Sequence, residues 1–263
     1  MRNLKRALSL ALAAIMLIGM MVVSASAASY NDLTDKDQIV NKDAVSMLVS
    51  LGIIEGKPDG SYGPTENVDR AQMAKMLSVI MNKGVDNSAL YQSVNSGLTD
   101  ITSNWAKGHI NYCYTTGIIA GRGNGTFDPS ATVTALEAAK MLLVAVGYDP
   151  KIEGFEGADW AINVSVRADE QGIFEGFTKD LSAPLNRDDA ALLIYNALDV
   201  EMIQSYTTNN YPIVYSDHRT ILSDKYGVIK VEGVVTANEW AILDDDTDTA
   251  LQEGKTRIYN PDG

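Results

Sequence analysis

The chain has 263 residues, of which 34 are acidic and 21 are basic, and its net charge is −13 at neutral pH. Phosphate backbones are bound by clustered Lys and Arg, so this acidic composition argues against nucleic acid as a partner. The single cysteine, Cys113, excludes an internal disulfide. His109 and His218 lie too far apart in sequence to suggest a Cys/His metal cluster.

Residues 1–28 have the features of a leader. Three basic residues precede an apolar run at 7–23, and Ala25-Ser26-Ala27 is a small-residue cleavage signal. This order predicts a secretory signal peptide. The alternative is a membrane-spanning anchor, because about 20 apolar residues can cross a bilayer. Cleavage would change the net charge from −13 to −16, since the leader holds three basic residues and no acidic one. We expect an exported protein with no membrane segment after cleavage.

One motif recurs three times in the remaining chain. The pattern Gly-Ile-(Ile or Phe)-x-Gly occupies 52–56, 117–121 and 172–176. Downstream of the first two copies, 57–64 aligns with 122–129 without a gap. Units of this size bury their apolar faces only when several pack together.

Each unit has the pattern of two helices joined by a loop. In the second unit, a first helix over 105–116 is expected to end at Gly117, and Thr132 or Thr134 is expected to cap the second helix. Cys113 lies at an apolar position of that first helix, so we expect a core residue, with a reactive thiol as the alternative. The second helices share apolar positions at i, i+3, i+4 and i+7: Met73, Met76, Leu77 and Ile80; Ala138, Met141, Leu142 and Ala145; Ala190, Leu193, Ile194 and Ala197.

The combined motifs resemble the S-layer homology (SLH) domain. They comprise (L/F)-x-D, W-A, G-I-I-x-G-x-x-(D/N)-G-(T/S)-(F/Y)-x-P and V-(T/D)-R-A-(E/Q), spread over about 29–200, most clearly in the second copy and least in the third. The resemblance implies a mainly α fold in which three helix–loop–helix SLH repeats form a pseudo-threefold bundle. The repeats, called units 1, 2 and 3 below, are expected at 29–83, 97–147 and 156–200.

The same resemblance implies a function at the cell surface. Members of this family bind secondary cell-wall polysaccharide, often with pyruvylated sugars, or a peptidoglycan-linked glycan, in grooves between repeats, and so anchor proteins to the wall without a covalent bond. Carried over position by position, the implied binding residues are Arg70, Arg187, Asp35, Asp100, Trp105, Trp160, Lys57 and Arg122. In unit 2, Ala135 stands in place of the arginine, and in unit 1, Val40 stands in place of the tryptophan. In unit 3, Phe155 replaces the aspartate and Phe177 replaces the loop cation. Unequal grooves are therefore expected.

The chemistry of these residues suits an acidic glycan. Arginine binds a carboxylate, such as that of a pyruvyl ketal, through two charge-assisted hydrogen bonds, and a tryptophan face can cover a sugar ring. Each residue type also has a structural alternative. The arginines could be exposed and paired with Asp69 or Asp188, the tryptophans could be core residues, the aspartates could be helix N-caps, and the loop cations could be merely solvated.

After residue 200 the pattern changes. Segments 211–215 and 227–236 are rich in β-branched and aromatic residues and predict strands, so 206–263 is expected to be the start of a β-rich domain that is incomplete. The acidic run at 244–248 lacks the Gly and Glu that an EF-hand needs at their positions, and a turn is favoured over a weak calcium site.

No enzyme motif stands out. The sequence has no G-x-S-x-G, H-E-x-x-H, Walker or dinucleotide-binding pattern, and no carboxylate pair is distinguished from the others. We expect no catalysis, metal or cofactor in the residues present. Two alternatives accompany the wall anchor: a wall-associated enzyme whose catalytic domain follows Gly263, and a structural S-layer lattice subunit that self-assembles.

Overall fold

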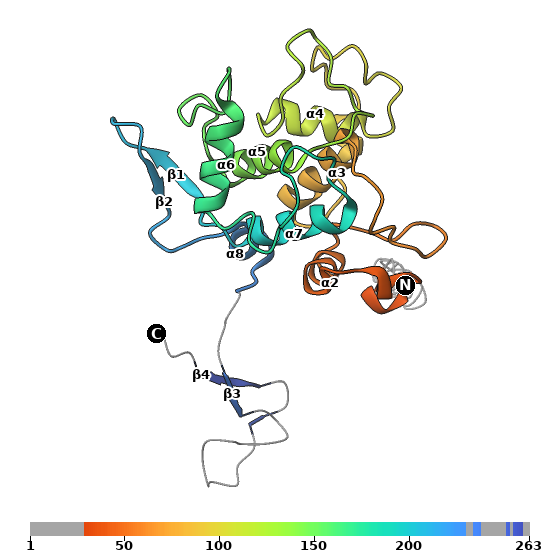
Figure 1. Ribbon diagram of the computed structural model, residues 1–263, viewed down its shortest axis with the longest axis vertical. Helices are drawn as coiled ribbons and strands as arrows, with labels where there is room; N and C mark the ends of the chain where they lie inside the picture. Colours follow the sequence, from red (N-terminus) through yellow and green to blue (C-terminus); the bar gives the residue numbers. More distant parts are fainter. Residues whose placement is uncertain (1–28, 230–233, 238–250, 253–254, 260–263) are drawn as a thin grey trace, which may run out of the picture.

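The computed structural model describes residues 29–229, 234–237, 251–252 and 255–259 (Figure 1). The predicted signal peptide, the acidic run at 244–248 and part of the second predicted strand segment lie outside the described residues. In the part of the chain that is described, no helix combines the length and apolar character needed to cross a membrane.

Three consecutive pairs of α-helices make up the three units. The pairs are α2 (Lys42–Ser50) with α3 (Arg70–Met81), α4 (Lys107–Thr115) with α5 (Ala135–Val146), and α6 (Trp160–Glu170) with α7 (Arg187–Leu198). Short 3-10 helices η1 (Tyr30–Asp32) and η2 (Lys36–Gln38) precede the first pair, and η3 (Ser88–Tyr91) lies between units 1 and 2.

The first helix of each unit ends at the glycine that opens the recurring motif. Gly52, Gly117 and Gly172 follow these helices with φ of 70°, 80° and 69°. A left-handed residue here is strained for any side chain with a Cβ, which explains why all three units keep glycine. The predicted end of the first helix of unit 2 at Gly117 is therefore confirmed.

The second helices begin at polar N-caps. Asp69 and Thr134 each close a capping box with the residue three positions on, and the side chain of Asn186 accepts a hydrogen bond from the backbone N–H of Asp189. Of the two threonines proposed from the sequence, Thr134 and not Thr132 is the cap.

The helices pack mainly between units. Helix α4 of unit 2 packs on α3 of unit 1, α6 of unit 3 packs on α5 of unit 2, and α2 of unit 1 packs on α7 of unit 3. Helix α5 also contacts α3 and α7 (Figure 1). These contacts merge the apolar faces of all three units into one buried core. A single unit would leave much of its apolar surface in water.

A closed ring of backbone hydrogen bonds joins the segments that precede the second helices. The N–H of Val68 donates to the carbonyl of Leu185 at 2.9 Å, Leu185 donates to Val133 at 2.8 Å, and Val133 donates back to Val68 at 2.9 Å. All three side chains are buried. Each unit thus gives one hydrogen bond and receives one.

A buried side chain also joins the first and last units. Asp188 at the start of α7 is 5% exposed and accepts hydrogen bonds from the backbone N–H groups of Val40 and Asn41 and from the Asn41 amide, at 3.1–3.3 Å. Burial raises the pKa of Asp188, and the backbone donors oppose that effect. The carboxylate therefore fixes the entry to α2 against α7.

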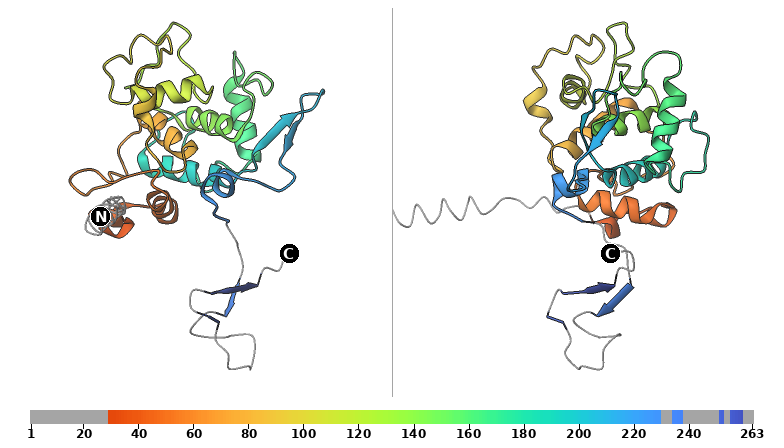
Figure 2. Two further views of the ribbon diagram at one scale, coloured as in Figure 1. Left: turned by 180° about the vertical axis from the view of Figure 1, so that it is seen from behind. Right: turned by 90° about the vertical axis from the view of Figure 1, so that its left-hand side faces the viewer.

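The region after unit 3 mixes strands with one helix. Strands β1 (Ile203–Tyr206) and β2 (Pro212–Val214) form an antiparallel hairpin that projects from the helices (Figure 2). Strands β3 (Val234–Ala237) and β4 (Arg257–Tyr259) pair antiparallel in a second two-stranded sheet. The strand expected from residue 227 is present in the described residues only as β3. Helix α8 (Ile221–Tyr226), which the sequence did not suggest, packs on α3 and α7.

Cys113 is a core residue, as predicted. Its side chain on α4 is fully buried, with Sγ 3.4 Å from the carbonyl oxygen of Ala74, and burial raises the pKa of the thiol well above its ordinary value. The reactive-thiol alternative is therefore wrong, since the thiolate is disfavoured and inaccessible.

His109 on α4 makes polar contacts at the junction between α3 and α4. His109 is 4% exposed, its Nδ1 lies 2.6 Å from the Ser78 hydroxyl, and its Nε2 lies 3.6 Å from a carboxylate oxygen of Asp86. Burial lowers the pKa of His109, although Asp86 opposes the shift. The equivalent positions of the α5–α6 pair hold Leu143 and Val164, both fully buried.

We expect mild acid to destabilise the fold through His109. Its folded pKa lies below the ordinary value of about 6.5, so the unfolded chain binds the proton more readily, and stability falls as the pH drops from about 6.5 through the folded pKa. The double variant Ser78→Leu/His109→Val copies the apolar pair of the α5–α6 junction and should lack this loss. Thermal unfolding between about pH 5 and pH 7.5 measures it.

His218 provides an internal reference for that comparison. It is exposed and paired with Glu201, which raises its pKa, so any stability it adds is present in acid and is lost as the pH rises. Both proteins keep this residue, and its effect cancels. Parallel pH profiles for the two proteins would contradict a role for His109.

Candidate functional site

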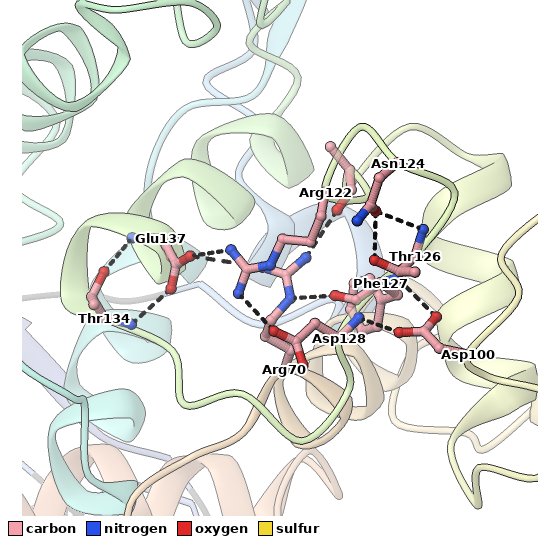
Figure 3. A network of polar contacts seen from close by, with 10 residues as sticks. Arg70, Asp100, Arg122, Asn124, Thr126, Phe127, Asp128, Thr134 and Glu137 are labelled. Atoms are coloured by element: carbon pink, nitrogen blue, oxygen red, sulfur yellow. Dashed lines mark hydrogen bonds and ion pairs between the residues drawn. The ribbon is translucent and has the colours of Figure 1, made fainter.

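Arg70, the first residue of α3 in unit 1, extends its side chain into the loop of unit 2 (Figure 3). Its Nε donates to the carbonyl of Phe127 at 2.8 Å and its Nη2 to that of Ala120 at 2.9 Å, and its guanidinium carbon lies 4.4 Å from the centre of the Phe127 ring. Burial, together with the nearby Arg122, lowers its pKa to about 10, so it stays charged at neutral pH. The proposed pairing with Asp69 is wrong, because Arg70 is 4% exposed and Asp69 caps the helix.

Arg187, the first residue of α7 in unit 3, repeats this arrangement in the loop of unit 1. Its Nε donates to the carbonyl of Tyr62 at 2.8 Å, its Nη2 donates to that of Glu55 at 3.3 Å, and its guanidinium carbon lies 4.7 Å from the Tyr62 ring centre. The Tyr62 hydroxyl donates back to the Arg187 carbonyl at 2.7 Å. Asp188 is not its partner, because that carboxylate binds the segment before α2.

The third junction, between units 2 and 3, has no arginine at this position. Ala135 begins α5 and has no side chain that could reach the loop of unit 3. A backbone hydrogen bond from the N–H of Leu136 to the carbonyl of Leu181, at 3.1 Å, corresponds to those from Ala71 to Pro129 and from Asp188 to Pro64 at the other junctions. The loop cation is replaced by Phe177, whose ring centre lies 6.2 Å from that of Phe174. Within the described units, two of the three junctions thus carry an arginine that crosses between units.

Asp35 and Asp100 hold the loops in shape. Each carboxylate accepts two hydrogen bonds from backbone N–H groups of its own unit, at 2.7–2.9 Å. The donors to Asp35 are Tyr62 and Gly63, and the donors to Asp100 are Phe127 and Asp128. Partial burial raises the pKa of both carboxyls, but the backbone donors outweigh it, and each pKa lies below its ordinary value. Of the N-cap alternatives, Asp35 occupies the N-cap position of η2 but makes no side-chain capping hydrogen bond, and the N-cap of α4 is Ala106 and not Asp100.

Two cavities open beside the arginines. Groove I, of 570 Å³, is lined by Arg70, Ala120, Arg122, Glu137, Lys140 and Trp160, among others. Groove II, of 210 Å³, is lined by Arg187, Glu55, Lys57, Gln72, Lys75 and Trp105, among others. Position by position, each groove takes its arginine from one unit, its loop cation and helix lysine from the next, and its tryptophan from the one after that. All three units therefore contribute to both grooves.

The two tryptophans differ in burial. Trp105 is 57% exposed, with the edge of its ring near His109, so it is not a core residue. Trp160 is half-buried against the edge of the core, and the Lys140 ammonium lies 5.5 Å from its ring centre. In both grooves an aromatic face forms part of the wall.

The loop cations are held by ion pairs and are not merely solvated. Lys57 pairs with Glu66. Arg122 lies 3.1 Å from Glu137 and 3.6 Å from Asp128, with its side chain 37% exposed (Figure 3). Glu137 Oε1 also lies 3.9 Å from Arg70, so one carboxylate positions both guanidinium groups of groove I.

Sequence reasoning missed the lysines of the second helices. Lys75 and Lys140 line grooves II and I, and they occupy the same position of α3 and α5, where α7 has Leu192. The signal lies in the repeat alignment, where α3 and α5 carry a lysine at the same position. Burial lowers the pKa of Lys140, and Glu156 opposes the shift.

Comparison with known proteins adds an independent line of evidence. The family model of the S-layer homology domain matches residues 29–74 and 97–139. The chain is 27% identical over its whole length to a cell surface protein of Thermoanaerobacter kivui, covering 32% of that protein. It is 34% identical over 43% of its length to an S-layer protein of Bacillus licheniformis, covering 12% of it.

An enzyme is also among the relatives. An amylopullulanase of Thermoanaerobacterium thermosulfurigenes is 30% identical over 65% of this chain, which covers 10% of the enzyme. The chain thus spans about a third or less of the length of these relatives. What it shares with them is a module found in proteins of different kinds.

The loop geometry leads to a stability prediction for Asp100. We expect Asp100→Ala to lower the free energy of unfolding by about 1–3 kcal/mol, because the N–H groups of Phe127 and Asp128 lose a charged acceptor. Chemical denaturation measures the change. Asp169→Ala, at an exposed position of α6, is the matched control and should change stability by less than about 0.5 kcal/mol. Equal effects of the two substitutions would contradict the role of Asp100.

Proposed function

We propose that this chain, two segments of which match the S-layer homology domain, is fastened to the cell wall by grooves I and II. These grooves bind a secondary cell-wall polysaccharide without a covalent bond. One observation carries the proposal. The same set of groups, an arginine, a loop cation, a helix lysine and a tryptophan, recurs in two cavities at equivalent junctions.

An acidic glycan matches this set of groups. A carboxylate such as that of a pyruvyl ketal accepts paired hydrogen bonds from a guanidinium, which carries five N–H donors. The carbonyl contacts of Arg70 account for two of those donors. Arg122 and Lys140 add positive charge to groove I, and Glu137 offers an acceptor for sugar hydroxyls. Because the whole chain is acidic, attraction of an anionic glycan depends on these local cations.

We also infer that unit 3 is a diverged copy of the same domain, and that the repeats at 29–83, 97–147 and 156–200 form a pseudo-threefold bundle. The ring of hydrogen bonds through Val68, Leu185 and Val133 supports this arrangement, as does the cyclic order in which each first helix packs on the preceding second helix. The junction at Ala135 lacks the arginine and the loop cation, so two of the three grooves are expected to bind glycan.

Two further functions are compatible with this anchor. The module could fix a wall-associated enzyme, for which the similarity to an amylopullulanase gives some support. It could instead fix a self-assembling lattice subunit, for which the similarity to an S-layer protein gives support. In both cases the grooves would have the same role.

The anchor can be tested with purified walls. The chain without residues 1–28 should co-sediment with intact walls of its host bacterium, and binding should be lost after the secondary polysaccharide is extracted, because the grooves would then have no ligand. Moderate salt should weaken binding, since it screens the contacts between the cations and an acidic glycan. Equal binding to extracted walls, or none to intact walls, would refute the proposal.

Trp105 allows a test of groove II that spares the fold. Its exposed ring can be removed as Trp105→Ala, and we expect wall affinity to fall by about three- to tenfold, because an aromatic contact with the sugar is lost. Arg70→Ala and Arg187→Ala test the grooves less directly, since each would also break two hydrogen bonds and a ring contact between units.

The matched control is Tyr211→Ala, which removes an aromatic ring that is 71% exposed on the β1–β2 hairpin, outside both grooves. Binding isotherms on intact walls should be unchanged by the control. If both variants bind like the wild type, Trp105 has no part in binding.

A further inference from the structure

A second cavity of 520 Å³, called the extension here, adjoins groove I. The two cavities share the wall formed by 118–121, together with Lys140 and Glu156. The extension adds Tyr114, Val144 and Pro150 to that shared wall. Because these residues border both spaces, groove I and the extension lie side by side, and the two together are called the cleft here.

The floor of the cleft is one face of α5. Glu137 lines groove I, Lys140 lines both cavities, and Val144 lines the extension. Residues at i, i+3 and i+7 lie on the same face of a helix, and seven residues span about 10 Å along its axis. Lys140 therefore stands at the midpoint, where its ammonium also donates to the carbonyl of Phe155.

Beside groove II, the chain that follows α3 passes close to Gly52. A Cβ on Gly52 would lie 3.3 Å from the carbonyl oxygen of Gly84, and a Cβ on Gly84 would lie only 2.4 Å from that of Leu51. Gly117, the counterpart of Gly52, has nothing within 4 Å of such a Cβ. The two junctions differ where the second helices end. Helix α5 stops at Gly147, with φ of 114°, and a Cβ there would lie 3.0 Å from the carbonyl oxygen of Ile203 in β1, so Gly147 packs on β1 and not on Gly117.

We propose that groove I and its extension bind two or more consecutive sugar residues of the glycan, whereas groove II binds one. This inference rests on the proposed function. The acidic residue occupies groove I beside Arg70, and the chain passes Lys140 and Glu156 at the junction. The next sugar lies in the extension, where the ring of Tyr114 and the aliphatic surface of Val144 face the C–H groups of a pyranose.

Fragment length separates the two grooves in an experiment. The probes are fragments of one and of three sugar residues, prepared from the purified wall polysaccharide of the host bacterium and titrated by calorimetry. All proteins carry Trp105→Ala, which weakens groove II, so that groove I dominates the signal. In this background, the longer fragment should bind about tenfold more tightly than the single residue, a gain of about 1.4 kcal/mol.

Two substitutions act on the extension alone. Val144→Trp fills it from the floor, and Tyr114→Ala removes a ring from its wall. Each should abolish most of the tenfold gain with fragment length. The matched control is Ile162→Trp, which places the same large ring on an exposed position of α6 outside the cleft and should keep the gain. Thermal unfolding checks that each variant is folded. If Val144→Trp does not fold, Tyr114→Ala alone tests the role of the extension.

The outcomes distinguish the inference from the proposed function. If the polymer and its fragments fail to bind the wild-type chain, the anchor itself is refuted, and the extension with it. If fragments bind but affinity does not rise with length, or if the rise survives in both extension variants, the extension has no role and the anchor stands.

Discussion

Three backbone hydrogen bonds, which run through Val68, Leu185 and Val133, hold together the points where the second helices begin. The rest of the structure depends on this ring. It places the first turn of each second helix against the loop of the next unit, so that Arg70 and Arg187 reach loop carbonyls far away in sequence. The first helices then pack on second helices of the preceding units, and the apolar faces merge into one core.

The arginines serve the fold and the proposed site at once. A buried guanidinium is costly unless it is well hydrogen-bonded, and for Arg70 the carbonyls of Phe127 and Ala120 with the ring of Phe127 meet that requirement. The same contacts fix the charge at the edge of groove I. Because both grooves draw on all three units, each exists only when the ring is closed. Fold and binding are thus coupled by the same bonds.

Local features of the fold were predictable from the sequence, and long-range ones were not. The glycine ends at 52, 117 and 172, the cap at Thr134 and the burial of Cys113 follow from a few neighbouring residues. The sequence could not show that Arg70 is buried in another unit or that Trp105 is exposed, since both depend on which helices meet. Helix α8 was missed because its six residues carry too short a pattern to distinguish a helix from a strand.

The contact between Asp188 and the segment before α2 has a consequence for the order of folding. Its two sides lie 147 residues apart, and the apolar face of α2 finds its partner, α7, only when the end of unit 3 is present. Contacts between distant parts of a chain form later than local ones, because they first require a long loop to close. The ring of units can therefore close only when all three are present, and α2 lacks its partner α7 before unit 3 exists. A single self-contained repeat would lack this ordering.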